Sequence, residues 1–189
     1  MIEDASRALA RTFGSAGDDI VLLGEGFGEL GGSEYLKVVH GLVKGSPPSL
    51  DFDRERALIA LLTKAAAAGL LQSAHDCSDG GIAITLAESA FESGGVGLEV
   101  DVPAAAQGIV ATLFGESASR AVVTLRPANR QALMDMATMI GVPALAIGRT
   151  GGSAIQIAVA GEVAIECMLT EAEVIWKTSL ERHFTGRAA

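Results

Sequence analysis

The residue types best suited to chemistry lie together in one short stretch, Ser-Ala-His-Asp-Cys-Ser-Asp-Gly-Gly, which ends at Gly81. Gly80 and Gly81 allow a sharp turn and a close ligand approach, and the alanine-rich run after them predicts a helix whose free N–H groups point at that turn. Such a turn binds anions, but Asp76 and Asp79 would repel a bare phosphate unless a divalent cation bridges them. The pattern therefore favours a magnesium nucleotide. The structural alternative is that Ser78 or Asp79 is an ordinary N-cap and the glycines only pack.

A second glycine-rich segment, Gly31-Gly32-Ser33-Glu34, joins a predicted strand to a predicted helix. Backbone N–H groups at such a junction are available to an anion. The segment lacks the lysine of a Walker A loop and is not a clean dinucleotide fingerprint. Its structural alternative is a flexible connector that ends in a Ser33 N-cap, with Glu34 in the first helical turn.

A third segment places Glu116, Ser117, Ser119 and Arg120 directly before an apolar strand. Hydroxyl and carboxylate groups beside an arginine at the entrance of a strand can bind a polar ligand. The same residues equally form a solvated loop, and both interpretations stay open at this point.

Charge and the remaining titratable residues argue against several classes of protein. The net charge is −9 and the 14 Lys and Arg residues are scattered, which disfavours nucleic acid and anionic membranes as partners. Cys77 and Cys167 lie far apart without metal-ligand spacing, so we expect a reducing, cytoplasmic environment. The three histidines also lack metal-ligand spacing, and His75, after an apolar strand, is more typical of a hydrogen-bonded structural histidine than of a base.

Strand and helix patterns alternate along the chain. Apolar runs predict strands at residues 20–23, 70–75, 96–100, 120–125, 144–148, 155–159 and 163–168. Helices are predicted from Ser33, from an Asp53 N-cap to a stop at Gly69, over 81–92, from Pro127 to about 140, and over 171–182, with a helical or irregular piece ending at Phe114. Gly151-Gly152 is expected to form a tight turn.

These elements predict an α/β (α+β) fold of three layers, in which helices cover one mixed sheet. Only 4% of the residues are aromatic, so the core must be built from Ala, Val, Ile and Leu. We expect the helices near residues 53–68 and 81–92 to bury their apolar faces against the sheet. The longest apolar segment is interrupted by Lys64 and is too short to cross a membrane.

Four motifs, in order and in register, give the chain a specific resemblance. They are Gly-Gly-Ser-Glu-Tyr from Gly31, the run from Gly69 to Ala83, Leu-Ala-Glu-Ser from Leu86, and Leu-Phe-Gly-Glu-Ser-Ala-Ser-Arg from Leu113. Together they resemble the C-terminal domain of the large synthetase subunit of phosphoribosylformylglycinamidine synthase. The chain is more distantly similar to aminoimidazole ribonucleotide synthetase, selenophosphate synthetase, thiamine-monophosphate kinase and a hydrogenase maturation factor.

The resemblance implies an ATP-dependent carbon–nitrogen ligase of purine biosynthesis. In that family, ATP phosphorylates the amide oxygen of formylglycinamide ribonucleotide, and ammonia from a glutaminase displaces phosphate, with Mg²⁺ offsetting phosphate charge. It also implies that residues 1–17 are a lead-in from an upstream ATP-binding domain and that residues 18–189 form the synthetase C-terminal α/β domain. The implied partners are those upstream domains, a glutaminase subunit and a small accessory subunit.

The resemblance implies different roles for individual residues of this chain. It implies Asp76 as a magnesium contact and, as nucleotide or substrate contacts, Gly80, Gly81, Glu116, Ser117 and Ser119. It places no catalytic residue in this chain. Ala118 stands where the catalytic half of the family has glutamine, which indicates a degenerate site that is structural or an auxiliary nucleotide site.

Two other interpretations stay open. In the first, the chain is a standalone or structural module whose Asp76 turn binds a metal nucleotide. In the second, it is a domain of a related synthetase or kinase such as selenophosphate synthetase or thiamine-monophosphate kinase. The Gly-Gly-Ser-Glu-Tyr and Ser-Ala-His-Asp motifs fit the purine enzyme better than the related kinases.

Overall fold

One seven-stranded mixed sheet organises the molecule, in the order β2-β4-β1-β5-β3-β6-β7. The computed structural model describes residues 8–185. All neighbouring strands are antiparallel except β3 and β6, which are parallel. The strands are β1 (Asp19–Leu23), β2 (Ser73–Asp76), β3 (Leu98–Val102), β4 (Ala121–Leu125), β5 (Ala144–Thr150), β6 (Ala154–Val159) and β7 (Glu162–Met168).

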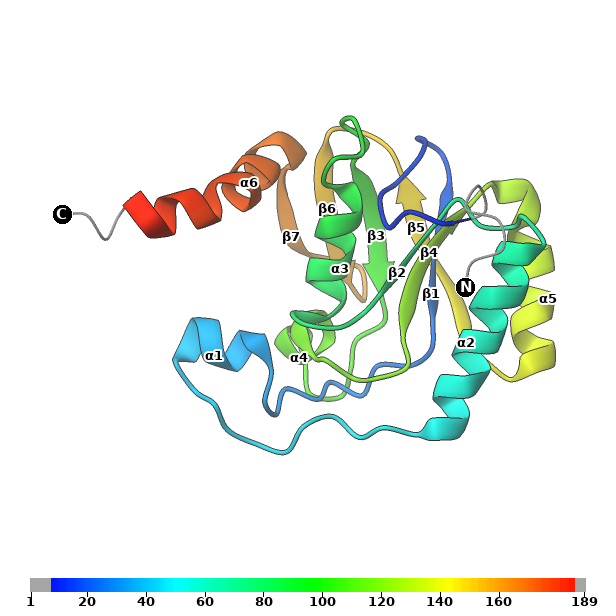
Figure 1. The fold of residues 1–189 in the computed structure, drawn as a ribbon, viewed down its shortest axis with the longest axis horizontal. Helices are drawn as coiled ribbons and strands as arrows, with labels where there is room; N and C mark the ends of the chain where they lie inside the picture. The colour runs from blue at the N-terminus through cyan, green and yellow to red at the C-terminus, as the bar shows by residue number, and fades with distance from the viewer. Residues whose placement is uncertain (1–7, 186–189) are drawn as a thin grey trace.

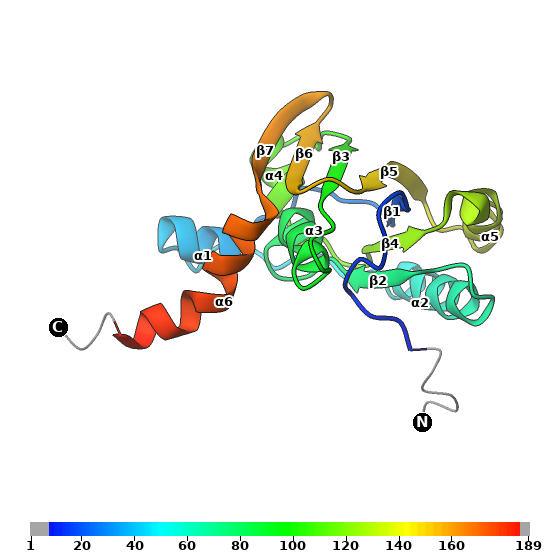
Figure 2. The same ribbon diagram turned by 90° about the horizontal axis from the view of Figure 1, so that it is seen from above.

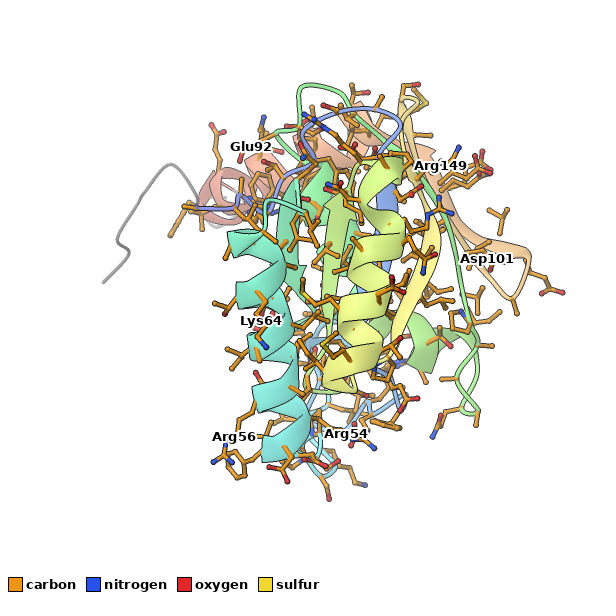
Figure 3. All side chains as sticks on the ribbon, turned by 90° about the vertical axis from the view of Figure 1, so that its right-hand side faces the viewer. Arg54, Arg56, Lys64, Glu92, Asp101 and Arg149 are labelled. Carbon is orange, nitrogen blue, oxygen red and sulfur yellow. The ribbon has the colours of Figure 1, made fainter. Side chains whose placement is uncertain are left out.

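Helices cover both faces of this sheet (Figures 1 and 2). They are α1 (Glu34–His40), α2 (Phe52–Ala67), α3 (Gly81–Ala90), α4 (Ile109–Phe114), α5 (Arg130–Ile140) and α6 (Leu169–Thr185), with a 3₁₀ turn at Pro127–Asn129. Figure 3 shows α2 and α5 side by side in front of the sheet, while Asp101 and Arg149 lie beside this pair. The expected mixed sheet covered by helices is confirmed.

The side chains of β1 alternate between the two faces of the sheet, which explains why helices cover both faces. Ile20 and Leu22 belong to the core cluster that contains residues of α3, whereas Val21 and Leu23 belong to the cluster that contains residues of α2 and α5. Successive side chains of a strand point to opposite faces, so the four consecutive apolar residues of β1, Ile20 to Leu23, need a helix on each side of the sheet. Leu86 of α3 is fully buried, as expected for this helix.

The structure corrects one predicted boundary of α2 and confirms the other. The N-cap of α2 is Asp51, not Asp53: one Asp51 carboxylate oxygen accepts the N–H groups of Asp53 and Arg54 at 2.9 and 3.2 Å. Asp53 is inside the helix, where its own N–H needs that acceptor. Gly69 has a φ of +67°, which confirms it as the stop signal.

The turn at Gly151-Gly152 does not close a hairpin. β3 lies between β5 and β6 in the sheet, so the two strands that this turn connects are not neighbours. β6 instead pairs with β7 in an antiparallel hairpin. The sequence pattern could not distinguish these two pairings, because both strands have the same apolar character.

Part of the predicted lead-in packs on the domain. Ala10 forms a bridge with Ser73, and Phe13 is buried in the core cluster that also contains Leu86. Residues 1–7 of the lead-in and residues 186–189 of the predicted domain lie outside the described residues. Among the described residues, no helix is long and apolar enough to cross a membrane.

Candidate functional site

The turn between β2 and α3 contains the predicted metal contact and the two predicted glycines. Asp76 ends β2 with an exposed side chain, Gly80 is the N-cap of α3 with a φ of +79°, and Gly81 is the first residue of the helix. A Cβ on Gly81 would lie 2.7 Å from the carbonyl oxygens of Leu113 and Gly115. Glycine is therefore required there for the close packing of α3 on α4, because any side chain would collide with backbone.

Asp79 does not cap α3, contrary to the sequence-based expectation. The N-cap residue is Gly80, and no side chain caps the helix locally. Ser78 contributes only its carbonyl oxygen, which accepts the N–H of Gly81 at 3.0 Å. The N–H of Gly80 itself donates to a distant residue, Glu116.

Glu116 joins two helix starts through one carboxylate oxygen. Its Oε1 accepts the N–H of Gly80 at 2.8 Å and the N–H of Glu34, the first residue of α1, at 2.9 Å. The backbone N–H of Glu116 donates to the carbonyl oxygen of Glu29 at 2.9 Å. Helix N-termini favour negative charge, and hydrogen bonds to a carboxylate are stronger than neutral ones. The carboxylate thus acts as an internal anion at the glycine-rich turns.

Ser117 and Arg120 continue the same internal network. Ser117 is fully buried, and its hydroxyl oxygen accepts the N–H of Phe27 at 2.9 Å. Arg120 is 5% exposed and donates from Nε to the Ser117 carbonyl at 3.0 Å and from Nη2 to the Gly115 carbonyl at 2.6 Å. These contacts order the segment from residue 115 to 120 as part of the core, rather than as a solvated loop.

Glu29 belongs to this network and was not singled out from the sequence. Its Oε1 accepts the N–H and the hydroxyl of Ser49 at 3.0 and 3.2 Å. Burial would raise the pKa of Glu29, but the hydrogen bonds from Ser49, the nearby Ser117 hydroxyl and the positive charge of Arg120 outweigh burial and hold the pKa below its usual value. No short motif contains these residues, so only the fold reveals their contact.

Ser119 points to a different place from Glu116 and Ser117. Its hydroxyl donates to Glu55 Oε2 in α2 at 2.6 Å. Asp76, Ser119 and Glu55 line one cavity of about 300 Å³ at the edge of α2. Two carboxylates and a hydroxyl in one cavity are oxygen ligands of the kind that Mg²⁺ prefers.

The predicted site is therefore divided in two. Gly80, Gly81, Glu116 and Ser117 form a packed internal network, whereas Asp76 and Ser119 face a cavity. Within residues 8–185, no group of three or more His, Cys, Asp or Glu residues could hold a metal ion. Mg²⁺ commonly uses only one or two carboxylates together with phosphate oxygens and water, so the residues present fit a site completed by a nucleotide.

His75 has the contacts of a structural residue. Its Nδ1 lies 3.3 Å from both the Thr85 carbonyl oxygen and the Ser89 hydroxyl of α3. Its Nε2 lies 3.5 Å from Glu88 Oε2. These contacts tie the imidazole to α3 and support the structural interpretation of this histidine.

Comparison with known proteins identifies relatives over most of the chain. The family model described as AIR synthase related protein, C-terminal domain, matches residues 15–160. The phosphoribosylformylglycinamidine synthase subunit PurL of Moorella thermoacetica is 40% identical over 180 residues, which is 95% of this chain and 24% of that protein. The PurL subunit of Thermobifida fusca is 46% identical over 168 residues, or 88% of this chain and 21% of that protein.

Solved structures share the fold. Thermotoga maritima PurL complexed with FGAR superposes with a TM-score of 0.74 at 18% identity and covers 89% of this chain and 30% of that chain. Thiamine-monophosphate kinase from Stenotrophomonas maltophilia has a TM-score of 0.54 at 23% identity and covers 84% of this chain and 54% of that chain. The chain thus spans about a quarter of the length of the first two PurL relatives.

Proposed function

This chain belongs to the AIR synthase related protein, C-terminal domain, family, and we propose that it is the C-terminal domain of a phosphoribosylformylglycinamidine synthase. The full enzyme would convert formylglycinamide ribonucleotide, ATP and glutamine-derived ammonia to formylglycinamidine ribonucleotide. The observation that carries the proposal is the 40 to 46% identity to PurL subunits over 88 to 95% of the chain.

The proposed role of this domain is to support a nucleotide site without performing chemistry alone. Mg²⁺ bound with ATP would offset the charge on the phosphates during phosphoryl transfer. Asp76, with Glu55 and Ser119 in the same cavity, is the residue on this chain that we assign to the metal side of that site. Glu116 and Ser117 are assigned to orienting the glycine-rich turns, because their polar atoms bond to backbone amides.

The proposed partners are upstream ATP-binding domains of the same polypeptide, a glutaminase subunit and a small accessory subunit. A solved structure described as PurLQS from Thermotoga maritima shares the fold with a TM-score of 0.72, and its description supports the choice of partners. We also propose a cytoplasmic location, since both described cysteines are free.

The test begins with the coding frame that precedes Met1. We expect about three further lengths of this chain, including a second copy of the same domain. A stop codon directly upstream would favour a standalone module. The longer polypeptide should hydrolyse ATP in the presence of formylglycinamide ribonucleotide and an ammonia source.

The 189-residue chain should fold and show no such hydrolysis, because the implied nucleotide-binding domains lie upstream. Turnover well above the blank, abolished by Asp76→Asn, would contradict this assignment. Asp135→Asn is a matched control: Asp135 is an exposed carboxylate of α5 that accepts a hydrogen bond from Gln131 at 2.8 Å. It should leave the activity of the longer polypeptide unchanged.

A further inference from the structure

Arg120 is a buried cation that lacks an ion pair. It is only 5% exposed, and among residues 8–185 no Asp or Glu side chain forms an ion pair with it. Its Nε and Nη2 donate to backbone carbonyl oxygens, whereas Nη1 donates no hydrogen bond within the same residues. The positive charge lowers the pKa of Glu29 without a direct ion pair. A buried charge without an opposite charge is costly, so this guanidinium favours an anion.

Arg120 lines a cavity of about 450 Å³, which we call the Arg120 cavity. Its walls are the loop after β1, the end of β3, α4 and the start of β5. The lining side chains are apolar except for Arg120, Glu25 and Thr112. The Thr112 hydroxyl already bonds to the Gly108 carbonyl oxygen and the Ala105 N–H, and Glu25 is exposed. The cavity has the size of a small-molecule site and combines apolar walls with one buried positive charge.

Gly26 leaves the guanidinium of Arg120 uncovered. A Cβ at this glycine would lie 2.9 Å from Nη1 and 3.5 Å from Cζ. Gly26 is not among the residues with a positive φ, so its backbone does not require glycine. Its own N–H donates to no acceptor in the described part of the chain and is a further donor available to an anion. The missing side chain therefore matters for access to Arg120.

The arginines of two other cavities are already neutralised by carboxylates. Arg130 and Arg149 line one of these cavities, and both donate to the Asp19 carboxylate. Arg54 lines the other, and its Nε lies 3.6 Å from a carboxylate oxygen of Asp51. An anion would have to compete with those carboxylates. In the Arg120 cavity it would meet a cation that has no such partner.

We propose that the Arg120 cavity binds a small organic anion with an apolar body, a carboxylate or a phosphate monoester, whose charged group pairs with Arg120. Arg120 also borders the cavity that contains Asp76, but the two carboxylates there, Asp76 and Glu55, suit a cation. The anion therefore belongs on the Gly26 side of Arg120. This site does not depend on the proposed function, because all of its walls belong to this chain.

The first measurement titrates the 189-residue chain with four probes and follows its backbone amides by NMR. Benzoate and phenyl phosphate have an apolar ring and a negative group, benzyl alcohol keeps only the ring, and inorganic phosphate keeps only the charge. At least one aromatic anion should shift amides 24–28 and 104–105, and benzyl alcohol and inorganic phosphate should bind at least about tenfold more weakly. The aromatic anion that binds more tightly identifies the charged group as carboxylate or phosphate.

The second measurement covers the guanidinium without removing its charge. Gly26→Val places a branched side chain against Nη1 and should weaken binding of the better aromatic anion at least about tenfold. Gly14→Val is the matched control, because Gly14 is exposed and a Cβ there would meet no atom within 4 Å. Both variants should keep the wild-type circular dichroism. If Gly26→Val does not, the titration of the wild-type chain decides by itself.

The inference is overturned if neither aromatic anion shifts these amides, or if benzyl alcohol binds as tightly as the aromatic anions. Unchanged binding in a folded Gly26→Val variant would also contradict it. Asp76→Asn should leave binding of the aromatic anion unchanged, because Asp76 does not line the Arg120 cavity. A loss of binding in Asp76→Asn would place the anion in the proposed magnesium–nucleotide site and would contradict a separate anion site.

Discussion

Glu116 and Asp76 are two carboxylates beside the same turn, and their surroundings are opposite. One oxygen of Glu116 accepts two backbone N–H groups that belong to the starts of α1 and α3. Asp76 is exposed, and among residues 8–185 its carboxylate accepts no hydrogen bond. The resemblance assigned ligand contacts to both residues, and in the described part of the chain they differ in that one Glu116 oxygen already accepts two amides.

The difference shows how a ligand-binding pattern can become structural. A carboxylate that satisfies two helix N-termini is costly to displace, because both amides would lose their acceptor. An exposed carboxylate needs no rearrangement to bind a cation. Ala118, between Ser117 and Ser119, adds no polar group to this segment. Substitution of Glu116 is therefore expected to lower the stability of the fold, and substitution of Asp76 to weaken ligand binding.

The largest effect on stability should come from truncating a core side chain of α3, the helix that begins at this turn. Leu86 of α3 is fully buried. Leu86→Ala should lower the free energy of unfolding by about 2–5 kcal/mol through lost burial and a cavity, measured by urea denaturation. Ile84 lies on the same helix and is 40% exposed, so Ile84→Ala is the control and should lower the free energy of unfolding far less. A loss below about 0.5 kcal/mol for Leu86→Ala would show that the packing of α3 is wrongly assigned.

Glu116→Ala tests the structural side of the comparison directly. It removes the acceptor of the Glu34 and Gly80 amides, so we expect a loss of about 1–3 kcal/mol in the free energy of unfolding. Glu116→Gln keeps a carbonyl oxygen in the same place and should lose clearly less. Equal losses for the two variants would mean that the charge, and not the shared acceptor, stabilises the two helix starts.

Asp19 extends the comparison to a fully buried carboxylate. Two hydrogen bonds from Arg130, both 2.6 Å long, and a third from Arg149 at 3.3 Å hold the pKa of Asp19 below its usual value despite burial. Because the folded pKa is the lower one, the stabilisation is complete above the unfolded pKa of about 4 and is lost as the pH falls below it.

Asp19→Asn should therefore be less stable than wild type at pH 7 and should lose less stability on acidification. Urea denaturation measured at several pH values between neutral and about 3 checks this difference. Parallel pH curves for the two proteins would contradict the depressed pKa of Asp19. The pKa of neighbouring Asp18 is raised by burial, partly offset by Arg126, so Asp18 changes the pH dependence in the opposite direction. Asp18 is therefore left unchanged in both proteins, and only Asp19 is substituted.

The smallest effect on stability is expected at Asp76. Asp76→Asn should change the free energy of unfolding by less than about 0.5 kcal/mol, because the side chain is exposed. In the longer polypeptide the same substitution should weaken magnesium–ADP binding in calorimetric titration. Unchanged nucleotide binding there would remove the metal role from Asp76, and submicromolar binding by the 189-residue chain would contradict a cleft shared with other domains.

The sequence by itself determined the local structure and the family. The alternating and helical patterns predicted the strands and the main helices, and Ser33 and Gly69 were identified as helix boundaries that the structure confirms. These features depend on the backbone preferences and hydrogen bonds of residues close together in the chain. The same short-range signals produced two wrong helix caps: Asp51 and not Asp53 precedes α2, and Gly80 and not Asp79 is the N-cap of α3.

Only the tertiary structure decided what the polar residues do. Glu116 reaches Gly80, 36 residues away, and Glu34, 82 residues away, while Ser119 turns instead to Glu55, 64 residues away. The insertion of β3 between β5 and β6 is equally invisible in a local pattern. A carboxylate or hydroxyl can bind a ligand or a backbone amide with the same atoms, and the choice depends on which amides the packed helices and strands bring within hydrogen-bond distance.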